Sequence, residues 1–207
     1  AQQLGATPIT FSDSSGYVVD EAGVDLELLK QVKEVERGRV ADYVERRPGA
    51  RLVTGGSVWD VPGDVALPCA TQNELDGDAA NTLLRGGCGV VSEGANMPST
   101  PEAVEAFQKA GILFGPGKAA NAGGVATSAL EMEQNAGRTR RDFATAEAKL
   151  TGIMTDIHDS CVTAADEYGR PGDYVLGANV AGFTRVADVM IAHGLSLIHI
   201  SEPTRPY

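Results

Sequence analysis

Small and polar residues between Gly111 and Met132 form the stretch of this sequence best suited to bind a ligand. A short apolar run, Ile112-Leu-Phe114, precedes the turn Gly115-Pro-Gly117, and a segment of small side chains follows and is helical by Ala126. Small side chains let a flat or anionic ligand approach the backbone closely. They leave few polar groups to orient such a ligand, namely Asn121, Thr127 and Ser128.

The run Gly115-Pro-Gly-Lys-Ala-Ala120 matches the G-x-G-x-x-G/A dinucleotide-binding fingerprint. That fingerprint belongs to the first strand of a βαβ unit, with an acidic residue at the end of the second strand. Here several strands are expected before it and none after it, so we treat the match as a chance one. A phosphate-binding P-loop is excluded as well, because position 112 is isoleucine and position 119 is alanine.

The segment Ser12-Asp-Ser-Ser-Gly16 follows an expected strand at Pro8–Phe11. In a Rossmann domain the second strand delivers groups to the adenosine ribose at this point. A carboxylate there normally suits an unphosphorylated ribose, whereas serine hydroxyls can bind a 2′-phosphate. The alternative is a simple turn capped by its own Asp and Ser side chains. The residues alone leave both open, and no arginine is adjacent in sequence.

Two further polar segments, Cys69-Ala-Thr-Gln-Asn73 and Glu93-Gly-Ala-Asn96, each follow a short apolar strand directly. Ligands of open α/β sheets gather at the carboxyl ends of strands, which favours a cofactor role. The alternative is an ordinary helix N-cap at Thr71 or Asn73, and both interpretations can hold together. We find no Ser-His-Asp arrangement and no metal-ligand pattern in the sequence.

The composition excludes some classes of partner. A net charge of -11 argues against nucleic acid and against an anionic membrane, since both need a basic surface. No apolar run approaches the roughly 20 residues of a membrane span, and no signal peptide opens the chain. The three widely spaced cysteines, Cys69, Cys88 and Cys161, predict buried free thiols in a reducing cytosol.

Short apolar strands alternate with helices, which predicts an α/β fold with a mostly parallel sheet covered on both faces. The expected strands are Pro8–Phe11, Arg51–Thr54, Val65–Leu67, Gly89–Ser92 and Ile112–Phe114. The expected helices are Val24–Glu36, Arg39–Arg47, Asn73–Arg85 and Pro101–Ala110. After Met132 we expect no strand. A second helix is expected at Tyr174–Ala192, interrupted or begun near Gly177 and Gly182, and before it a long helix that carries on one face Leu150, Ile153, Met154, Ile157, Cys161 and Ala164.

Several motifs in the same order make the chain similar to the hexameric NADP-type glutamate dehydrogenases over Ala1–Gly194. They are Ser12–Gly16, Leu67–Glu74, Glu93–Pro98, Gly117–Met132 and Gly177–Phe183. The resemblance implies a Rossmann-like NADP-binding domain followed by carboxyl-terminal helices that return to a separate substrate domain. It also implies reversible conversion of L-glutamate to 2-oxoglutarate and ammonium by a cytoplasmic homohexamer.

Site residues are carried over from the same motifs. The resemblance places Asp13, Ser14 and Ser15 at the adenosine ribose and its phosphate, and Ala70, Thr71 and Gln72 along the cofactor groove. It places Asn96 and Asn121 at the nicotinamide ribose and carboxamide, and Val125 and Ser128 at the substrate side chain, with Ser128 on the distal carboxylate. No catalytic residue is assigned, because the family's catalytic lysine and aspartate lie in an amino-terminal substrate domain.

The same resemblance divides the chain into a partial Rossmann domain at 1–116, helices at 117–194 and a tail at 195–207. The tail resembles a translated sequencing adapter, with a natural tail as the alternative. The first Rossmann strand and its glycine-rich turn have no counterpart here. That strand is central in the usual order, so its loss would leave two strand edges unpaired. We therefore expect this chain, made alone, to fold poorly and to be inactive.

Two other functions remain as alternatives. A leucine, valine or phenylalanine dehydrogenase of the same superfamily needs an apolar side-chain pocket, and Ser128 favours a carboxylate instead. A non-catalytic nucleotide-binding or regulatory module is the alternative of another class. The coding DNA upstream of Ala1 distinguishes all three.

Overall fold

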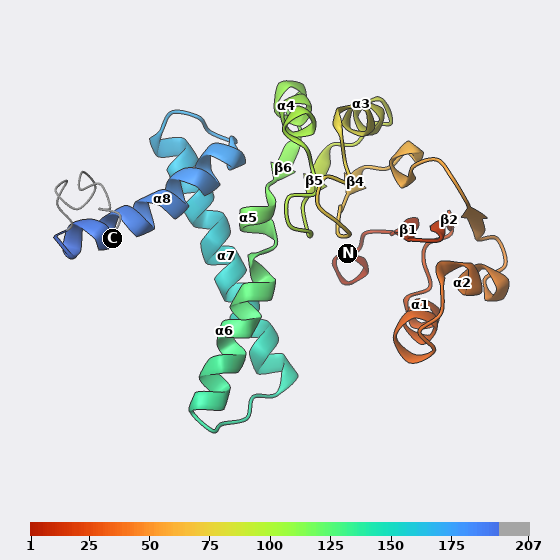
Figure 1. The fold of residues 1–207 in the computed structure, drawn as a ribbon, viewed down its shortest axis with the longest axis horizontal. Coiled ribbons are helices and arrows are strands. Elements are labelled where there is room, and N and C mark those ends of the chain that lie inside the picture. The colour runs from red at the N-terminus through yellow and green to blue at the C-terminus, as the bar shows by residue number, and fades with distance from the viewer. Residues whose placement is uncertain (195–207) are drawn as a thin grey trace, which may run out of the picture. The chain divides into compact units, whose positions relative to one another are not determined.

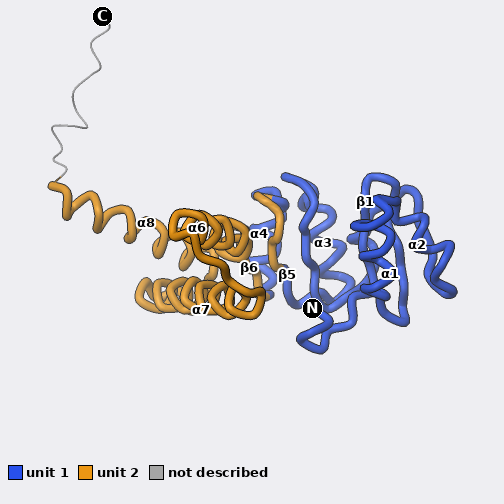
Figure 2. Tube along the Cα trace, turned by 90° about the horizontal axis from the view of Figure 1, so that it is seen from below, with its two compact units in different colours: residues 1–91, 98–112 blue, residues 92–97, 113–207 orange. Residues whose placement is uncertain are grey.

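The computed structural model describes residues 1–194, which contain the helices and strands drawn in Figure 1. The chain separates into two compact units (Figure 2). Unit 1 comprises Ala1–Val91 and Pro98–Ile112, and unit 2 comprises Ser92–Met97 and the chain from Leu113 onward. The domain bounds expected from the sequence, 1–116 and 117–194, remain a prediction.

An antiparallel sheet with the order β1-β2-β3 lies in unit 1. Its strands are β1 (Thr10–Asp13), β2 (Gly16–Val19) and β3 (Arg51–Val53). Thr10 pairs with Val19, and Tyr17 pairs with Val53. The expectation of a mostly parallel sheet is wrong for these strands. The reason is that β2, which the sequence analysis missed, follows β1 after a two-residue turn, and so short a connection forces antiparallel pairing.

One core cluster of unit 1 lies between this sheet and its helical segments, α1 (Leu26–Lys30), the π-helical turn η2 (Gln31–Val35) and α2 (Val40–Arg46). These segments confirm the two helices expected here. The buried cluster consists of Val18, Val24, Val32, Val40 and Tyr43. Burying a valine-sized side chain stabilises a fold by roughly 1.5–3 kcal/mol, so this cluster fixes the helices onto the sheet.

The other three-stranded sheet has the order β4-β5-β6, with strands β4 (Val65–Ala66), β5 (Val90–Ser92) and β6 (Leu113–Gly115). Its first pair is parallel, with Val65 opposite Val90 and Ala66 opposite Val91. The parallel pairing expected from alternating strands and helices is confirmed here. Among the described residues, β1 and β4 belong to different sheets and do not pair.

Helices α3 (Gly77–Arg85) and α4 (Pro101–Ala110) show how local sequence sets helix bounds. Helix α4 has the expected bounds, since Thr100 caps its first turn and Gly111 ends it at φ 68°. Helix α3 begins four residues later than expected from Asn73. Its N-cap is Asp76, whose Oδ1 accepts a hydrogen bond from the Ala79 N–H at 2.9 Å. Short 3-10 turns occupy Gln2–Leu4 and Val58–Asp60.

Unit 2 contains the helices α5 (Gly117–Ala120), α6 (Ala122–Ala136), α7 (Phe143–Glu167) and α8 (Tyr174–Ala192). As expected, no strand follows β6 within residues 1–194. Helix α8 runs without interruption through Gly177 and Gly182. A Cβ on Gly177 would lie 2.0 Å from the Cys161 carbonyl oxygen, so glycine is what allows α8 to touch the backbone of α7.

Helix α8 is also 19 residues long with a mean hydropathy of 1.3, which by length and composition would let it cross a membrane. An apolar segment of this length differs from the expectation that no run approaches a membrane span. One such helix is weak evidence for a membrane span, because core helices of soluble proteins share these properties. Arg185 and Asp188 lie within it.

Two cysteines are buried as expected, and burial raises the pKa of both the Cys88 and the Cys161 thiol. The expectation is wrong for Cys69, which is exposed. It lies in the loop after β4, which ends at Ala66, so no sheet neighbour covers it. The tail at 195–207 lies outside the described residues.

Candidate functional site

The Asp13 carboxylate, at the end of β1, holds together three parts of unit 1. Its Oδ1 accepts hydrogen bonds from the backbone N–H and the hydroxyl of Ser15, and its Oδ2 accepts from the Lys33 ammonium at 2.8 Å and from the Val40 N–H at 3.2 Å. Burial by itself raises the pKa of Asp13, but the bonds from Lys33 and Ser15 outweigh it and hold that pKa well below its usual range. The self-capped turn is therefore present, and the carboxylate is already neutralised by a cation.

Two serine hydroxyls and a guanidinium lie exposed beside this turn. The Arg39 Nη1 donates a hydrogen bond to the Ser14 Oγ at 2.9 Å, and Ser14, Ser15 and Arg39 are all exposed. Lys33 and Arg39 were not among the predicted residues, because they are far from the turn along the chain. The available signal was the helical pattern at Val24–Glu36 and Arg39–Arg47, since short connections return both helices to the preceding strand.

The predicted groove residues Ala70, Thr71 and Gln72 lie in the exposed loop that follows β4. The Ala70 N–H donates to the Glu74 Oε1 at 2.9 Å, which ties this loop back on itself. The alternative that Thr71 or Asn73 caps a helix is wrong, because Asp76 is the N-cap of α3. The loop thus presents backbone and short side chains to the surface.

Asn96 and Asn121 belong to two linked segments of unit 2. Glu93, which directly follows β5, is 5% exposed, and its Oε2 accepts a hydrogen bond from the Gly117 N–H at 2.5 Å. The Asn121 Nδ2 donates to the Ala95 carbonyl oxygen at 2.9 Å. Asn96 is exposed next to this contact. Asn121, between α5 and α6, is therefore hydrogen-bonded to the loop after β5, and Asn96 is the next residue of that loop after Ala95.

Val125 and Ser128 lie three residues apart, and so on the same side of α6. Val125 is 77% exposed, and the Ser128 Oγ donates to the Gly124 carbonyl oxygen of its own helix at 3.2 Å. The described residues do not enclose this pair, so its role toward a substrate remains a prediction.

The predicted residues divide between the two units. Asp13, Ser14, Ser15, Ala70, Thr71 and Gln72 belong to unit 1, and Asn96, Asn121, Val125 and Ser128 belong to unit 2.

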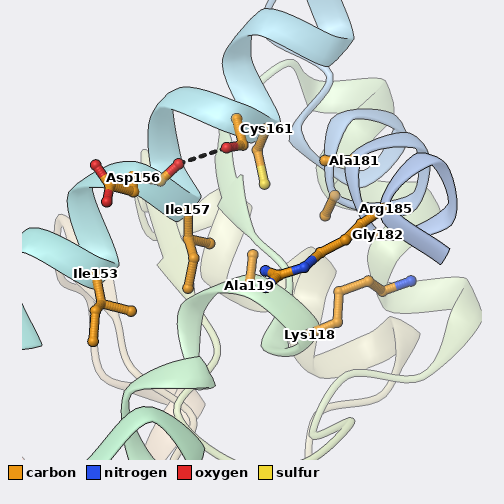
Figure 3. A pocket seen from close by; sticks show the side chains of 11 residues that line it. Lys118, Ala119, Ile153, Asp156, Ile157, Cys161, Ala181, Gly182 and Arg185 are labelled. Atoms are coloured by element: carbon orange, nitrogen blue, oxygen red, sulfur yellow. Dashed lines mark hydrogen bonds between the residues drawn. The ribbon is translucent and has the colours of Figure 1, made fainter. Parts of the chain in front are cut away.

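A groove of about 560 Å³ between α5, α7 and α8 contains none of the predicted residues (Figure 3). Ile153, Ile157 and Ala119 form part of its apolar lining, and Arg185 extends across it. At its edge the Lys118 ammonium donates to the Asn179 Oδ1. Among the residues that the structure describes, no group of three or more His, Cys, Asp or Glu side chains is placed to hold a metal ion.

Comparison with known proteins shows which enzymes this chain resembles. The NADP-specific glutamate dehydrogenase of Escherichia coli K12 is 54% identical over 198 residues, and that of Helicobacter pylori J99 is 48% identical over 200. These matches cover 94% and 93% of this chain but only 44% and 45% of those enzymes, so the chain spans less than half their length. The glutamate dehydrogenase of Plasmodium falciparum superimposes with a TM-score of 0.90 at 41% identity, covering 94% of this chain and 43% of that one.

The family model for glutamate/leucine/phenylalanine/valine dehydrogenases matches residues 1–194, which is every residue described above. The chain therefore belongs to the glutamate/leucine/phenylalanine/valine dehydrogenase family.

Proposed function

We propose that this chain is the coenzyme-binding part of an enzyme that converts L-glutamate to 2-oxoglutarate and ammonium, reversibly, with NADP. The observation that carries the proposal is the group of two serine hydroxyls and two cations at the end of β1. Identity of 54% to an enzyme named as NADP-specific supports the same coenzyme.

The arrangement at the end of β1 suits a ribose 2′-phosphate. Arg39 offers a planar set of N–H donors, which pairs well with a phosphate, and Ser14 adds a hydroxyl donor, while the Ser15 hydroxyl donates to Asp13 beside them. A free carboxylate at Asp13 would repel that phosphate. Here the Lys33 ammonium and the Ser15 donors already satisfy it, so a cationic and hydroxyl-rich surface remains.

The exposed loop at Ala70, Thr71 and Gln72 offers backbone groups to the middle of the coenzyme. Asn96 and Asn121 offer amides to the nicotinamide ribose and carboxamide, and the bound NADP supplies the ring that accepts or donates hydride. Val125 and Ser128 then contact the amino-acid side chain. A hydroxyl at Ser128 suits a distal carboxylate, whereas the leucine and phenylalanine enzymes of this family need an apolar surface there.

We further propose that the complete enzyme is a cytoplasmic homohexamer that binds neither nucleic acid nor membranes. The net charge of -11 supports the last two points, because phosphate-rich partners select basic surfaces.

A chimera tests the proposal. Residues 1–194 of this chain replace the matching segment of the Escherichia coli enzyme, and NADPH oxidation is followed with ammonium and one of three oxo acids. We expect turnover with 2-oxoglutarate to exceed turnover with the oxo acids of leucine and phenylalanine by about 100-fold or more. The unmodified Escherichia coli enzyme is the control. A soluble, folded chimera that prefers an apolar oxo acid, or that turns over none, contradicts the proposal.

A further inference from the structure

The buried carboxylate of Glu93 has no role in the coenzyme contacts carried over above. It lies directly after β5, is 5% exposed, and accepts a hydrogen bond from the Gly117 N–H at 2.5 Å. Gly117 is the first residue of α5, directly after the turn that follows β6. A buried carboxylate that accepts a backbone N–H forms one of the stronger hydrogen bonds in proteins. Glu93 thus ties the segment after β5 to the segment after β6.

Gly117 is enclosed at this contact. A Cβ added to it would lie 3.0 Å from the Ala95 carbonyl oxygen, 3.2 Å from the Glu93 Oε2 and 3.3 Å from the Asn121 Nδ2. All of these groups belong to unit 2. The backbone of Gly117 therefore sits in a space set by Glu93 on one side and by the Ala95–Asn121 contact on the other.

The same contact fixes the amide of Asn121. Its Nδ2 donates to the Ala95 carbonyl oxygen at 2.9 Å, which uses one of its two N–H donors. Among the residues that the structure describes, its Oδ1 acceptor and its second N–H meet no other partner, so both are open to a ligand. A carboxamide such as that of nicotinamide offers the matching donor and acceptor. Moving Gly117 away from Glu93 would shift the start of α5 and, with it, this amide.

We propose that Glu93 is a positioning residue for the nicotinamide end of the coenzyme, acting through Gly117 and Asn121. This inference rests on the proposed function. It assigns Glu93 no contact with the coenzyme and no proton transfer. Its effect is confined to unit 2, so the adenosine end, which unit 1 supplies, stays unchanged.

The experiment compares two ligands on the chimera described above. NADPH contains the nicotinamide, whereas 2′,5′-ADP carries only the phosphorylated adenosine end. For Glu93→Ala we expect the NADPH affinity to fall about 10-fold or more, because a hydrogen bond to a charged group is lost. The 2′,5′-ADP affinity should stay within about twofold.

Glu93→Gln keeps an acceptor of the same size and should recover most of the NADPH affinity. Gly117→Ala should lower the NADPH affinity in the same way, since its Cβ crowds Glu93, Ala95 and Asn121. This variant replaces Glu93→Ala if Glu93→Ala is insoluble. The matched control is Glu131→Ala, which removes an exposed glutamate on α6 and should change the affinity for neither ligand.

The outcomes separate the two proposals. If the chimera with Glu93 intact binds neither ligand, the proposed function fails. If it binds both, and Glu93→Ala or Gly117→Ala weakens both equally or neither, the positioning role is wrong while the proposed function stands.

Discussion

The buried carboxylate of Asp20 shows how single residues stabilise unit 1. Asp20 is 1% exposed, and its Oδ2 accepts hydrogen bonds from the Tyr43 hydroxyl at 2.9 Å and from the Arg47 Nε at 2.8 Å. The Tyr43 hydroxyl in turn accepts from the Asp25 N–H, which ties the network to the start of α1. Burial by itself raises the pKa of Asp20, but the bonds from Arg47 and Tyr43 outweigh it and lower that pKa.

Asp20→Asn should destabilise the chimera at neutral pH, because Arg47 loses its nearer anionic partner and keeps only Asp25, at 4.0 Å. We expect a loss of about 2 kcal/mol, below the usual range for a fully buried pair because solvent reaches Arg47. A carboxylate with a lowered pKa stabilises the fold above its unfolded-state value of 3.8 and loses that contribution as the pH falls below it.

Calorimetric melting temperatures at several pH values measure this effect. The difference between the unchanged protein and Asp20→Asn should shrink as the pH falls below about 4. If the melting temperatures of the two proteins instead differ by the same amount at every pH, ionisation of Asp20 is not responsible for the loss of stability.

Arg39→Ala tests the 2′-phosphate contact at the residue scale. Removing the guanidinium should raise the KM for NADPH about 10-fold, because a charged hydrogen bond is lost, and leave the KM for NADH within about twofold. The backbone N–H of Arg39 still donates to Asp42, so α2 keeps its first turn. The matched control is Arg51→Ala, an exposed arginine opposite Val19, away from the Asp13–Gly16 end of the sheet. An equal rise in the KM for NADPH and the KM for NADH would contradict the assignment of Arg39 to the 2′-phosphate.

At the scale of elements, the crossing of α7 and α8 depends on one glycine. Gly177→Ala would place a Cβ against the Cys161 carbonyl, so we expect a loss of roughly 1–3 kcal/mol or more from overpacking. Gly182→Ala, five residues along the same helix, meets nothing within 4 Å and should stabilise by about 0.5–1 kcal/mol through helix propensity. Urea unfolding of the chimera with each substitution measures the change in its free energy of unfolding. Equal effects of the two changes would mean that the close contact is not what requires glycine at position 177.

Helix bounds were predictable where capping residues are local in sequence. Thr100, Pro101 and Gly111 predict the ends of α4, and α8 has the bounds expected from its apolar pattern. The start of α3 was not predictable in this way. Asn73 has a left-handed backbone conformation (φ 57°), and the N-cap of the helix is Asp76.

Contacts between distant segments could not be predicted in the same way. The sequence motif predicts Asp13 and Ser14, but Lys33 reaches Asp13 and Arg39 reaches Ser14 only through the packing of the two helices on the first sheet. Strand β2 was missed because it directly follows a polar turn of two residues, Ser14 and Ser15, at the end of β1. Its Gly16 has φ 141°, and a Cβ there would lie 2.5 Å from the Val53 carbonyl oxygen, a requirement that no local pattern reveals.

At the scale of the whole molecule, the helices of unit 2 leave large apolar side chains in contact with solvent. Val125, Phe143, Phe183 and Ile191 are each at least 73% exposed. Exposed apolar groups of this number favour association or aggregation. The chain also spans less than half the length of its relatives.

Residues 1–194 made alone should therefore bind a hydrophobic fluorescent dye, self-associate on gel filtration and show no glutamate turnover. The chimera should bind the dye weakly under the same conditions. A cooperative melt of the isolated chain that NADPH raises would contradict this expectation.

The division of the predicted contacts between two units bears on how coenzyme preference can be changed. The groups proposed for the adenosine end come from the first antiparallel sheet and its helices, whereas the contacts proposed to position the amide of Asn121 come from Glu93, Ala95 and Gly117. The two sets share no residue. Substitutions that retune the choice between phosphorylated and unphosphorylated dinucleotides can thus accumulate, by selection or by engineering, while the hydride-transfer end keeps its geometry.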